Sequence, residues 1–141
     1  MPTREANAVW NGKLQDGKGT VKLGSGAFEG SYTVPSRFES GNGTNPEELL
    51  GASHAGCYSM QLAAFLSEAG FEPESVETTA KVTLDKDGDG FSISKIALHT
   101  KAKVPDIDES TFMEHANKAK TNCPISKALS ATDISLDASL I

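Results

Sequence analysis

Two cysteines are the residues of this chain that are best suited to covalent chemistry. Cys57 lies in an alanine-rich stretch, TNPEELLGASHAGCYSMQLAAFLSEAG, and Cys123 lies in the unrelated setting TNCPIS. Two thiols so far apart do not form a CxxC pair, and a zinc site requires three or four clustered ligands. The pattern fits a nucleophilic thiol together with a second thiol that resolves its oxidised form.

The neighbourhood of each thiol decides between packing and chemistry. Free cysteine packs like a small hydrophobe, so either cysteine taken alone favours a structural role. A reactive thiolate needs a cation, a helix N-terminus or a network of donors. Cys123 directly precedes a helix predicted to begin at Pro124, whereas Cys57 lies several turns into its helix, where the dipole no longer acts. Arg37, in SRFES, is the natural cation for Cys57, and a solvated loop arginine is the alternative of equal weight.

Other polar residues give weaker signals. His54 lies one turn before Cys57 and suggests a Cys-His dyad, but a histidine on a buried helix is more often structural, and no orienting acid is evident. The acidic segment DKDGDG copies the first half of a calcium loop, yet Ile96 stands where a bidentate glutamate is required. We therefore predict a hairpin turn there and no metal site.

Length and charge limit the expected partners. The chain has 141 residues, enough for a single domain over residues 1–141 with a sizeable core, and its formal net charge is −6. Lysine and arginine do not cluster, so nucleic acid is not an expected partner. The sequence shows no signal-peptide pattern and no apolar run long enough to cross a bilayer. We expect a cytoplasmic protein with reduced thiols and no membrane partner.

The first half of the chain predicts strands followed by a long helix. Alternating apolar residues punctuated by glycine predict three short strands within residues 6–34. Asn45 as the N-cap, with Pro46 at the first helical position, begins a helix of about six turns. The helix is predicted to end at Ala69, before Gly70.

The second half predicts a hairpin, two helices and a final strand. Residues 76–84 and 91–102 alternate on either side of a turn, and a slip in their phase indicates a bulge near Lys95. Helices are predicted over residues 108–121 and 124–130, and the last strand over residues 134–140. Because hairpins rather than βαβ crossovers connect the strands, we predict an α+β fold with antiparallel sheet.

The long helix carries apolar side chains over most of its circumference, which predicts burial nearly all round. Its small residues Gly51, Ala52 and Gly56 leave room for another backbone. A chain of this length has little with which to surround such a helix. We therefore expect a homodimer that buries it.

Three segments together resemble a known family. Arg37 in TVPSRFES, the run GTNPEELLGASHAGCYSM and the later AKTNCPIS closely resemble the OsmC/Ohr family, in particular its OsmC branch. The likeness extends from the early Trp10-Asn11-Gly12 to the final strand. It implies an intertwined homodimer in which two antiparallel sheets wrap two long central helices. It also implies a cysteine-dependent antioxidant peroxidase that prefers organic hydroperoxides to hydrogen peroxide.

The resemblance assigns roles to four residues. Cys57 resembles the peroxidatic cysteine, Cys123 the resolving one, Arg37 the arginine that stabilises the thiolate, and Glu47 the partner of that arginine. The implied cycle forms a sulfenic acid on Cys57 and then a Cys57–Cys123 disulfide, which an external dithiol reopens. It requires no metal, flavin or haem. Dipole reasoning alone would instead name Cys123 the more acidic thiol.

The position of Glu47 leaves its mode of action open. Ten residues of straight helix separate it from Cys57 by about 15 Å, so it cannot touch that sulfur. Either Arg37 spans the gap, or the glutamate serves the site differently, for example across a dimer interface. Glu48 is the second candidate, with helix capping as its expected role.

Two other functions use the same fold without a peroxidase. One is a dimeric protein that carries an apolar ligand in a buried pocket, and the other is a thiol-based redox sensor. A mere binder does not need Arg37, Glu47, Cys57 and Cys123 together. A sensor is expected to present a surface for an effector, and the sequence indicates none.

Overall fold

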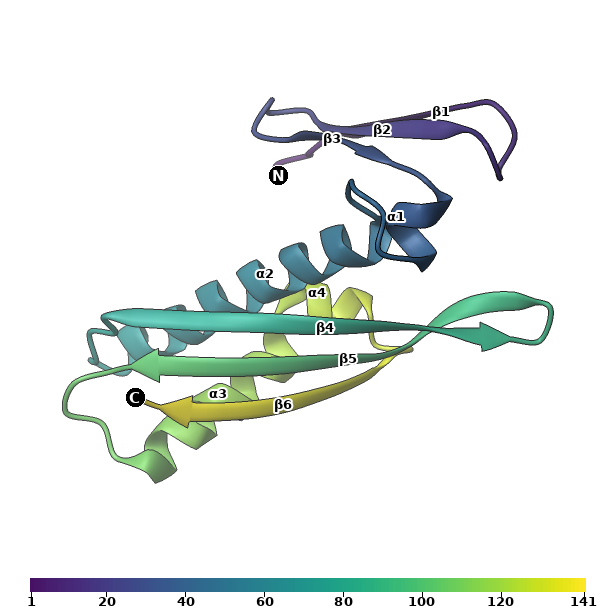
Figure 1. Cartoon of the computed structure of the whole chain (residues 1–141). Helices are drawn as coiled ribbons and strands as arrows, with labels where there is room; N and C mark the ends of the chain where they lie inside the picture. The colour runs from purple at the N-terminus through teal and green to yellow at the C-terminus, as the bar shows by residue number, and fades with distance from the viewer. The chain divides into compact units, whose positions relative to one another are not determined.

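The computed structural model describes all 141 residues. They divide into two compact units, Met1–Leu49 and Leu50–Ile141. Figure 1 traces the chain from the N-terminal strands in purple to the C-terminal strand in yellow. No helix combines the length and the apolar character that crossing a membrane requires.

The first unit contains an antiparallel sheet of three strands in the order β1-β2-β3. The strands are β1 (Ala6–Asn11), β2 (Lys18–Leu23) and β3 (Glu29–Tyr32), as the alternating pattern predicts. A short helix, α1 (Val34–Phe38), follows where the sequence indicates only a loop. It forms because Thr33 and Ser36 make a capping box, with Ser36 N donating to Thr33 Oγ1 at 3.1 Å and Thr33 N to Ser36 Oγ at 2.8 Å.

The long helix α2 (Pro46–Glu68) begins and ends close to the predicted residues. Glu48 N donates to Asn45 Oδ1 at 2.7 Å, so Asn45 caps the helix and satisfies one of the donors that a helix start leaves unpaired. Gly70 follows the helix with φ of 92°, a left-handed conformation that glycine adopts without strain. The local signals of the sequence are therefore confirmed at both ends.

The second unit is built on a sheet with the order β4-β5-β6. Strands β4 (Ser75–Asp87) and β5 (Gly90–Lys103) form the predicted antiparallel hairpin. Thr83 pairs with Lys95 but Leu84 pairs with Ile93, so Ser94 is the extra residue of a bulge. The predicted irregularity near Lys95 is confirmed.

The last strand corrects one expectation. Strand β6 (Asp133–Leu140) runs parallel to β5, whereas the sequence pattern predicts antiparallel sheet. Helices α3 (Glu109–Asn122) and α4 (Pro124–Ala128) connect the two strands. The α+β class holds, but a parallel neighbour requires a crossover of a dozen residues or more, and these helices provide it.

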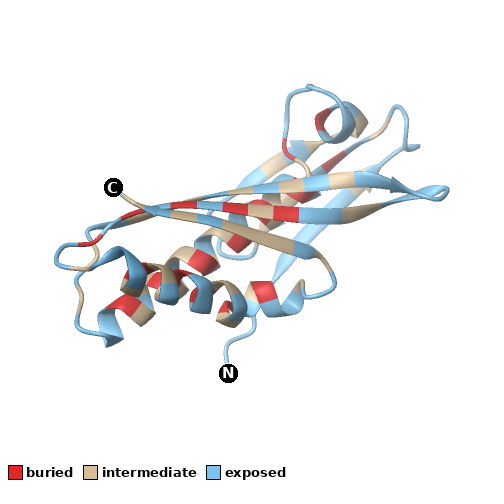
Figure 2. Cartoon of the chain, turned by 90° about the horizontal axis from the view of Figure 1, so that it is seen from below, coloured by how far each residue is buried: buried red, intermediate tan, exposed pale blue.

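The core of the second unit lies between its sheet and its helices. In Figures 1 and 2 the helices lie on one face of the β4-β5-β6 sheet. The buried cluster joins side chains of α2, β5 and α3. Its fully buried members are Tyr58, Leu62, Leu66, Ile96, Leu98, Ala102, Phe112, Ala116 and Ala119.

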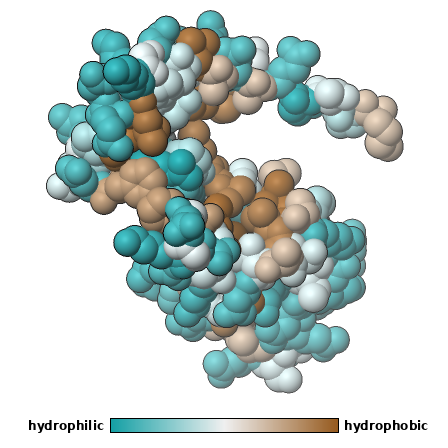
Figure 3. Space-filling view, turned by 90° about the vertical axis from the view of Figure 1, so that its right-hand side faces the viewer, coloured by the Kyte–Doolittle hydropathy of each residue, from teal (hydrophilic) through white to brown (hydrophobic).

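Helix α2 is buried along one stripe and not all round. His54, Tyr58, Leu62 and Leu66 have no exposed surface, whereas Met60 is 77% exposed. Within the single chain the sheet and helices of the second unit cover one side of α2, and burial nearly all round stays a prediction for the homodimer. Figure 3 shows hydrophobic residues, in brown, among those at the surface of the molecule.

Candidate active site

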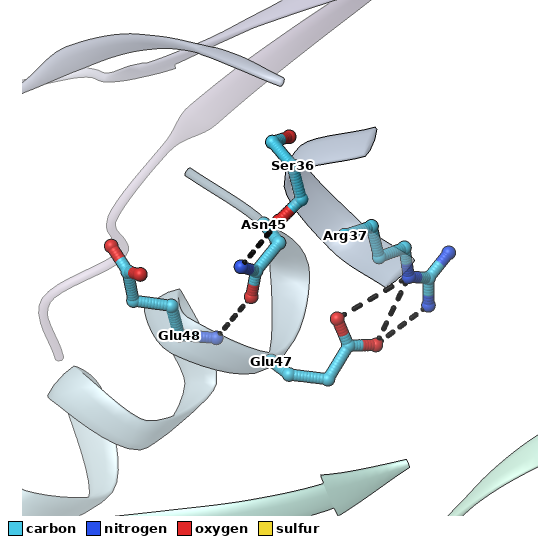
Figure 4. Close-up of polar contacts among 5 residues, drawn as sticks. All are labelled: Ser36, Arg37, Asn45, Glu47 and Glu48. Carbon is cyan, nitrogen blue, oxygen red and sulfur yellow. Dashed lines mark hydrogen bonds and ion pairs between the residues drawn. The ribbon is translucent and has the colours of Figure 1, made fainter. Parts of the chain in front are cut away.

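Arg37 and Glu47 form a tight ion pair in the first unit. Arg37 Nη2 lies 2.7 Å from Glu47 Oε1, and Arg37 Nε donates to both carboxylate oxygens at 3.2 and 3.3 Å. Figure 4 shows the guanidinium of α1 facing the carboxylate at the start of α2. The side chain of Glu47 is 11% exposed and that of Arg37 37%. This geometry fixes the guanidinium more firmly than a single contact would.

Backbone-anchored hydrogen bonds hold that pair in place. Ser36 Oγ donates to the carbonyl of Thr44 at 2.8 Å, and Asn45 Nδ2 donates to the carbonyl of Ser36 at 3.0 Å. Asn45 also caps α2, so one amide side chain joins α1 to the first turn of α2 (Figure 4). Arg37 follows Ser36 by one residue and Glu47 follows Asn45 by two, so these bonds hold the backbones of the ion pair close together.

A small apolar cavity lies beside Arg37. Its volume is about 90 Å³. It is lined by Trp10, Leu14, Tyr32, Thr33, Val34, Arg37 and Phe38. The guanidinium carbon of Arg37 lies 5.3 Å from the centroid of the Phe38 ring. The cation therefore stands at the edge of an aromatic and aliphatic surface.

The two cysteines meet in the second unit, although 66 positions separate them. Their Sγ atoms lie 2.7 Å apart, and both are free thiols. Cys57 lies on α2 and is partly exposed, whereas Cys123 is fully buried. Cys123 ends α3, with its N–H donating to Ala119 O at 2.9 Å, and its own carbonyl accepts from Lys127 N of α4 at 3.0 Å. Two helices thus fix the backbone of Cys123.

The protonation of Cys57 follows from these neighbours. Burial raises the pKa of the Cys57 thiol, and Cys123 raises it further, first through the hydrogen bond between the two thiols and then through the repulsion that two thiolates would feel. The backbone N–H of Ile125 opposes this by donating to the sulfur, which lowers the pKa. No cation acts on Cys57 among these groups. The thiol form therefore prevails at neutral pH unless a positive charge approaches.

His54 does not form a dyad with Cys57. Its Nε2 lies 2.8 Å from Ser126 Oγ on α4, and burial lowers the pKa of the imidazole, which is neutral. Its Nδ1 is buried without a partner. The sequence favours a structural histidine at this position, and the contact with Ser126 agrees with that.

The structure brings the expected residues together in two pairs. Arg37 and Glu47 pair within the first unit, and Cys57 and Cys123 pair within the second. Glu48 donates its backbone N–H to the N-cap and does not pair with Arg37. No group of three histidine, cysteine or carboxylate side chains is arranged to hold a metal ion.

Sequence reasoning missed several residues around the thiols. The sequence gives no signal for Ser126, for the N–H of Ile125, or for the hydrogen bond that Tyr58 Oη donates to Ala116 O at 3.0 Å. Tyr58 lies 58 positions from Ala116, and Ser126 lies 72 positions from its partner His54. No local pattern could have signalled these contacts.

Comparison with known proteins places the chain in one family. The family described as OsmC-like protein matches residues 39–138, a range that contains Glu47 and both cysteines. The chain is 50% identical over 135 residues to peroxiredoxin OsmC of Escherichia coli (strain K12), covering 95% of this chain and 94% of that protein. It is 30% identical over 113 residues to organic hydroperoxide resistance protein OhrB of Bacillus subtilis (strain 168), covering 78% and 80%.

The solved structures agree with these sequence matches. The crystal structure of the organic hydroperoxide resistance protein OhrB of Bacillus subtilis superposes with a TM-score of 0.76. The two chains are 28% identical there, and the match covers 96% of this chain and 98% of the other. The fold and the sequence thus point to the same relatives.

Removing Cys123 should make Cys57 more acidic. In Cys123→Ala the hydrogen bond between the two thiols and the repulsion between their charged forms are lost, while burial remains, so the pKa of Cys57 falls part of the way back toward the ordinary thiol range. The rate of Cys57 alkylation by iodoacetamide, followed against pH, should reach its midpoint at lower pH than in the unmodified chain. An unchanged or higher midpoint would contradict the assigned cause.

Proposed function

Because this chain belongs to the family of OsmC-like proteins and is an enzyme of the peroxidase class, we propose that it reduces organic hydroperoxides to alcohols. Cys57 is the peroxidatic residue and Cys123 the resolving one. The observation that carries the proposal is the 2.7 Å approach of two free thiols from distant parts of the chain. A pair of packed, inert cysteines has no reason to lie in sulfur contact.

The first step oxidises Cys57. Its thiolate attacks one oxygen of the hydroperoxide, the O–O bond breaks, and the alkoxide takes a proton and leaves as alcohol. Cys57 becomes a sulfenic acid. The backbone N–H of Ile125 already donates to the Cys57 sulfur, which stabilises negative charge there.

The second step closes a disulfide. The Cys123 sulfur attacks the Cys57 sulfur, the S–O bond breaks, and water leaves with the proton of the Cys123 thiol. Because the two sulfurs already lie within contact, this step requires little movement of the backbone. An external dithiol then reduces the disulfide by exchange and restores both thiols. The cycle requires no metal or organic cofactor.

Arg37 is proposed to supply the charge that Cys57 lacks. Burial and Cys123 raise the pKa of Cys57, so the reaction depends on a cation that favours the thiolate. Glu47 holds the guanidinium through both of its carboxylate oxygens and fixes its direction. This role for Glu47 requires no contact with sulfur. In this proposal residues 1–141 act as one functional domain.

The preference for organic substrates rests on the apolar cavity beside Arg37. Its lining offers an alkyl or aryl group a surface with little polar character, which a small hydrated oxidant cannot use. The relative OhrB is named for resistance to organic hydroperoxides. We assign the reaction to the cytoplasm, where thiols such as these are kept reduced.

We propose a homodimer as the working form. Along α2 the residues Ala52, Gly56 and Met60 are exposed and lie opposite the buried stripe. Their small or flexible side chains permit a second helix to approach closely. A helix with an apolar exposed face is stabilised when a partner covers it.

The central test is thiol titration with hydroperoxide. One equivalent of cumene hydroperoxide should remove two thiols per chain, and it should react faster than hydrogen peroxide does. Survival of both thiols would refute the peroxidase mechanism, and equal or reversed rates would refute the organic preference.

Two cysteine variants serve as matched controls for that titration. Cys57→Ser should abolish peroxide consumption, because the attacking atom is gone. Cys123→Ser should react once and stop at sulfenic or sulfinic acid, visible by mass spectrometry as one or two added oxygens on Cys57. The reverse pattern would exchange the two assignments.

Replacing Arg37 should slow the oxidation of Cys57. Arg37→Gln removes the charge, and we expect a loss of at least tenfold in the rate at neutral pH, about 1.4 kcal/mol in the barrier. The pH midpoint of the reaction should rise. Arg37→Lys keeps the charge but loses the two-nitrogen contact with Glu47. Its oxidation rate should therefore lie between that of the unmodified chain and that of Arg37→Gln. Stopped-flow measurement that finds Arg37→Gln as fast as the unmodified chain would remove Arg37 from the mechanism.

A charge on the exposed face of α2 should disrupt the dimer. Ala52→Glu would place an unpaired carboxylate in the proposed contact at a cost of several kcal/mol, giving a monomeric or insoluble protein without activity. Asn117→Glu, which places the same charge on an exposed position of α3, is the control and should remain dimeric. Analytical ultracentrifugation that finds the unmodified chain monomeric at micromolar concentration, yet fully active, would overturn the dimer.

A further inference from the structure

Helix α4 cannot hold its own position. It has five residues, Pro124–Ala128, and a helix of that length is unstable in isolation. Its N-cap is Cys123, whose side chain makes no capping hydrogen bond. The location of the resolving thiol therefore depends on tertiary contacts that hold α4 against the rest of the second unit.

Two buried hydrogen bonds from α2 flank the thiol pair. Tyr58 Oη donates to the carbonyl of Ala116 on α3 at 3.0 Å. His54 Nε2 and Ser126 Oγ join α2 to α4 at 2.8 Å. In sequence Cys57 lies between His54 and Tyr58. The two bonds thus attach the helices on either side of Cys123 to the turns of α2 that carry Cys57.

The His54–Ser126 contact is buried at a free-energy cost. His54 is fully buried, Ser126 is 6% exposed, and Nδ1 of His54 has no partner. A neutral imidazole with one unpaired nitrogen is less stable in a core than an aliphatic side chain of similar size. Its presence one turn from Cys57 is explained if the contact with α4 serves the cysteines.

We propose that the His54–Ser126 hydrogen bond is a positioning contact: it holds Cys123 against Cys57 and so determines how often an oxidised Cys57 closes the disulfide. The contact touches neither substrate nor the reacting atoms. It acts through α4, which carries the backbone of Cys123 at its N-terminus and donates the Ile125 N–H to Cys57.

The second half of this inference rests on the proposed function. A Cys57 sulfenic acid has two fates. Attack by the Cys123 thiol gives the disulfide and water, whereas a second hydroperoxide adds an oxygen and gives sulfinic acid and alcohol. The two reactions compete, so a contact that keeps Cys123 within reach protects Cys57 from irreversible oxidation.

Three variants of the two partners and one control variant isolate the contact. Ser126→Ala removes the hydroxyl, and Ser126→Thr restores one at the same position. Ser59→Ala is the matched control, because it removes a serine hydroxyl of α2 whose bond is also 2.8 Å long but leads to Thr78 on β4. His54→Gln removes the other partner and keeps the inference testable if Ser126→Ala does not fold.

The first measurement does not depend on peroxidase activity. The fraction of Cys57–Cys123 disulfide is determined at equilibrium in glutathione redox buffers, which report the effective concentration of one thiol at the other. Loss of one net hydrogen bond should lower that concentration roughly three- to tenfold in Ser126→Ala and His54→Gln. Ser126→Thr should recover most of it, and Ser59→Ala should leave it unchanged.

The second measurement follows the fate of Cys57 under excess cumene hydroperoxide. Mass spectrometry should find several times more Cys57 sulfinic acid in Ser126→Ala than in the unmodified chain, while the rate of the first oxidation changes less than twofold. A merely structural role would slow both steps or neither.

The outcomes separate this inference from the function on which it rests. A shift in the glutathione equilibrium without any reaction with hydroperoxide would refute the peroxidase and retain the positioning contact. An equilibrium unchanged in Ser126→Ala and His54→Gln, or shifted equally in Ser59→Ala, would overturn the positioning contact whatever the activity.

Discussion

The buried stripe of helix α2 is the contact on which the second unit depends. Tyr58, Leu62 and Leu66 have no exposed surface and join the inner face of β5 and the inner face of α3 in one cluster. Burial of each such side chain stabilises the fold by about 1.5–3 kcal/mol. Residues of the same stripe also form hydrogen bonds, His54 with α4 and Tyr58 with α3. The neighbouring Ser59 forms one with β4. Cys57 is carried on this fixed helix.

The chemistry of the thiols follows from that packing. Because α3 and α4 are held on α2, Cys123 lies where its sulfur meets Cys57, and Cys123 is buried while Cys57 is partly shielded from solvent. Shielding and the second thiol both raise the pKa of Cys57. The arrangement that favours disulfide closure therefore disfavours the thiolate that must react first. A peroxidase built this way needs a cation, the role that we propose for Arg37, which Glu47 pairs with in the first unit.

The ion pair depends on short-range structure, in contrast to the thiol pair. Arg37 and Glu47 are ten positions apart, and the Ser36–Thr44 and Asn45–Ser36 hydrogen bonds hold together the helix starts that carry them. These bonds span eight and nine positions of the chain. The guanidinium can thus be oriented within the first unit, before any contact with the rest of the protein is considered.

The sequence by itself determined those features that depend on residues close together in the chain. Asn45, Pro46 and Gly70 mark the ends of α2, the phase slip marks a bulge near Lys95, and the motifs around Cys57 and Cys123 identify the family. Only the tertiary structure decided that β6 runs parallel to β5, that α2 is covered on one side, and that His54 meets Ser126. The physical reason is range: caps and turns act over three or four residues, whereas strand direction and helix contacts depend on partners far along the chain.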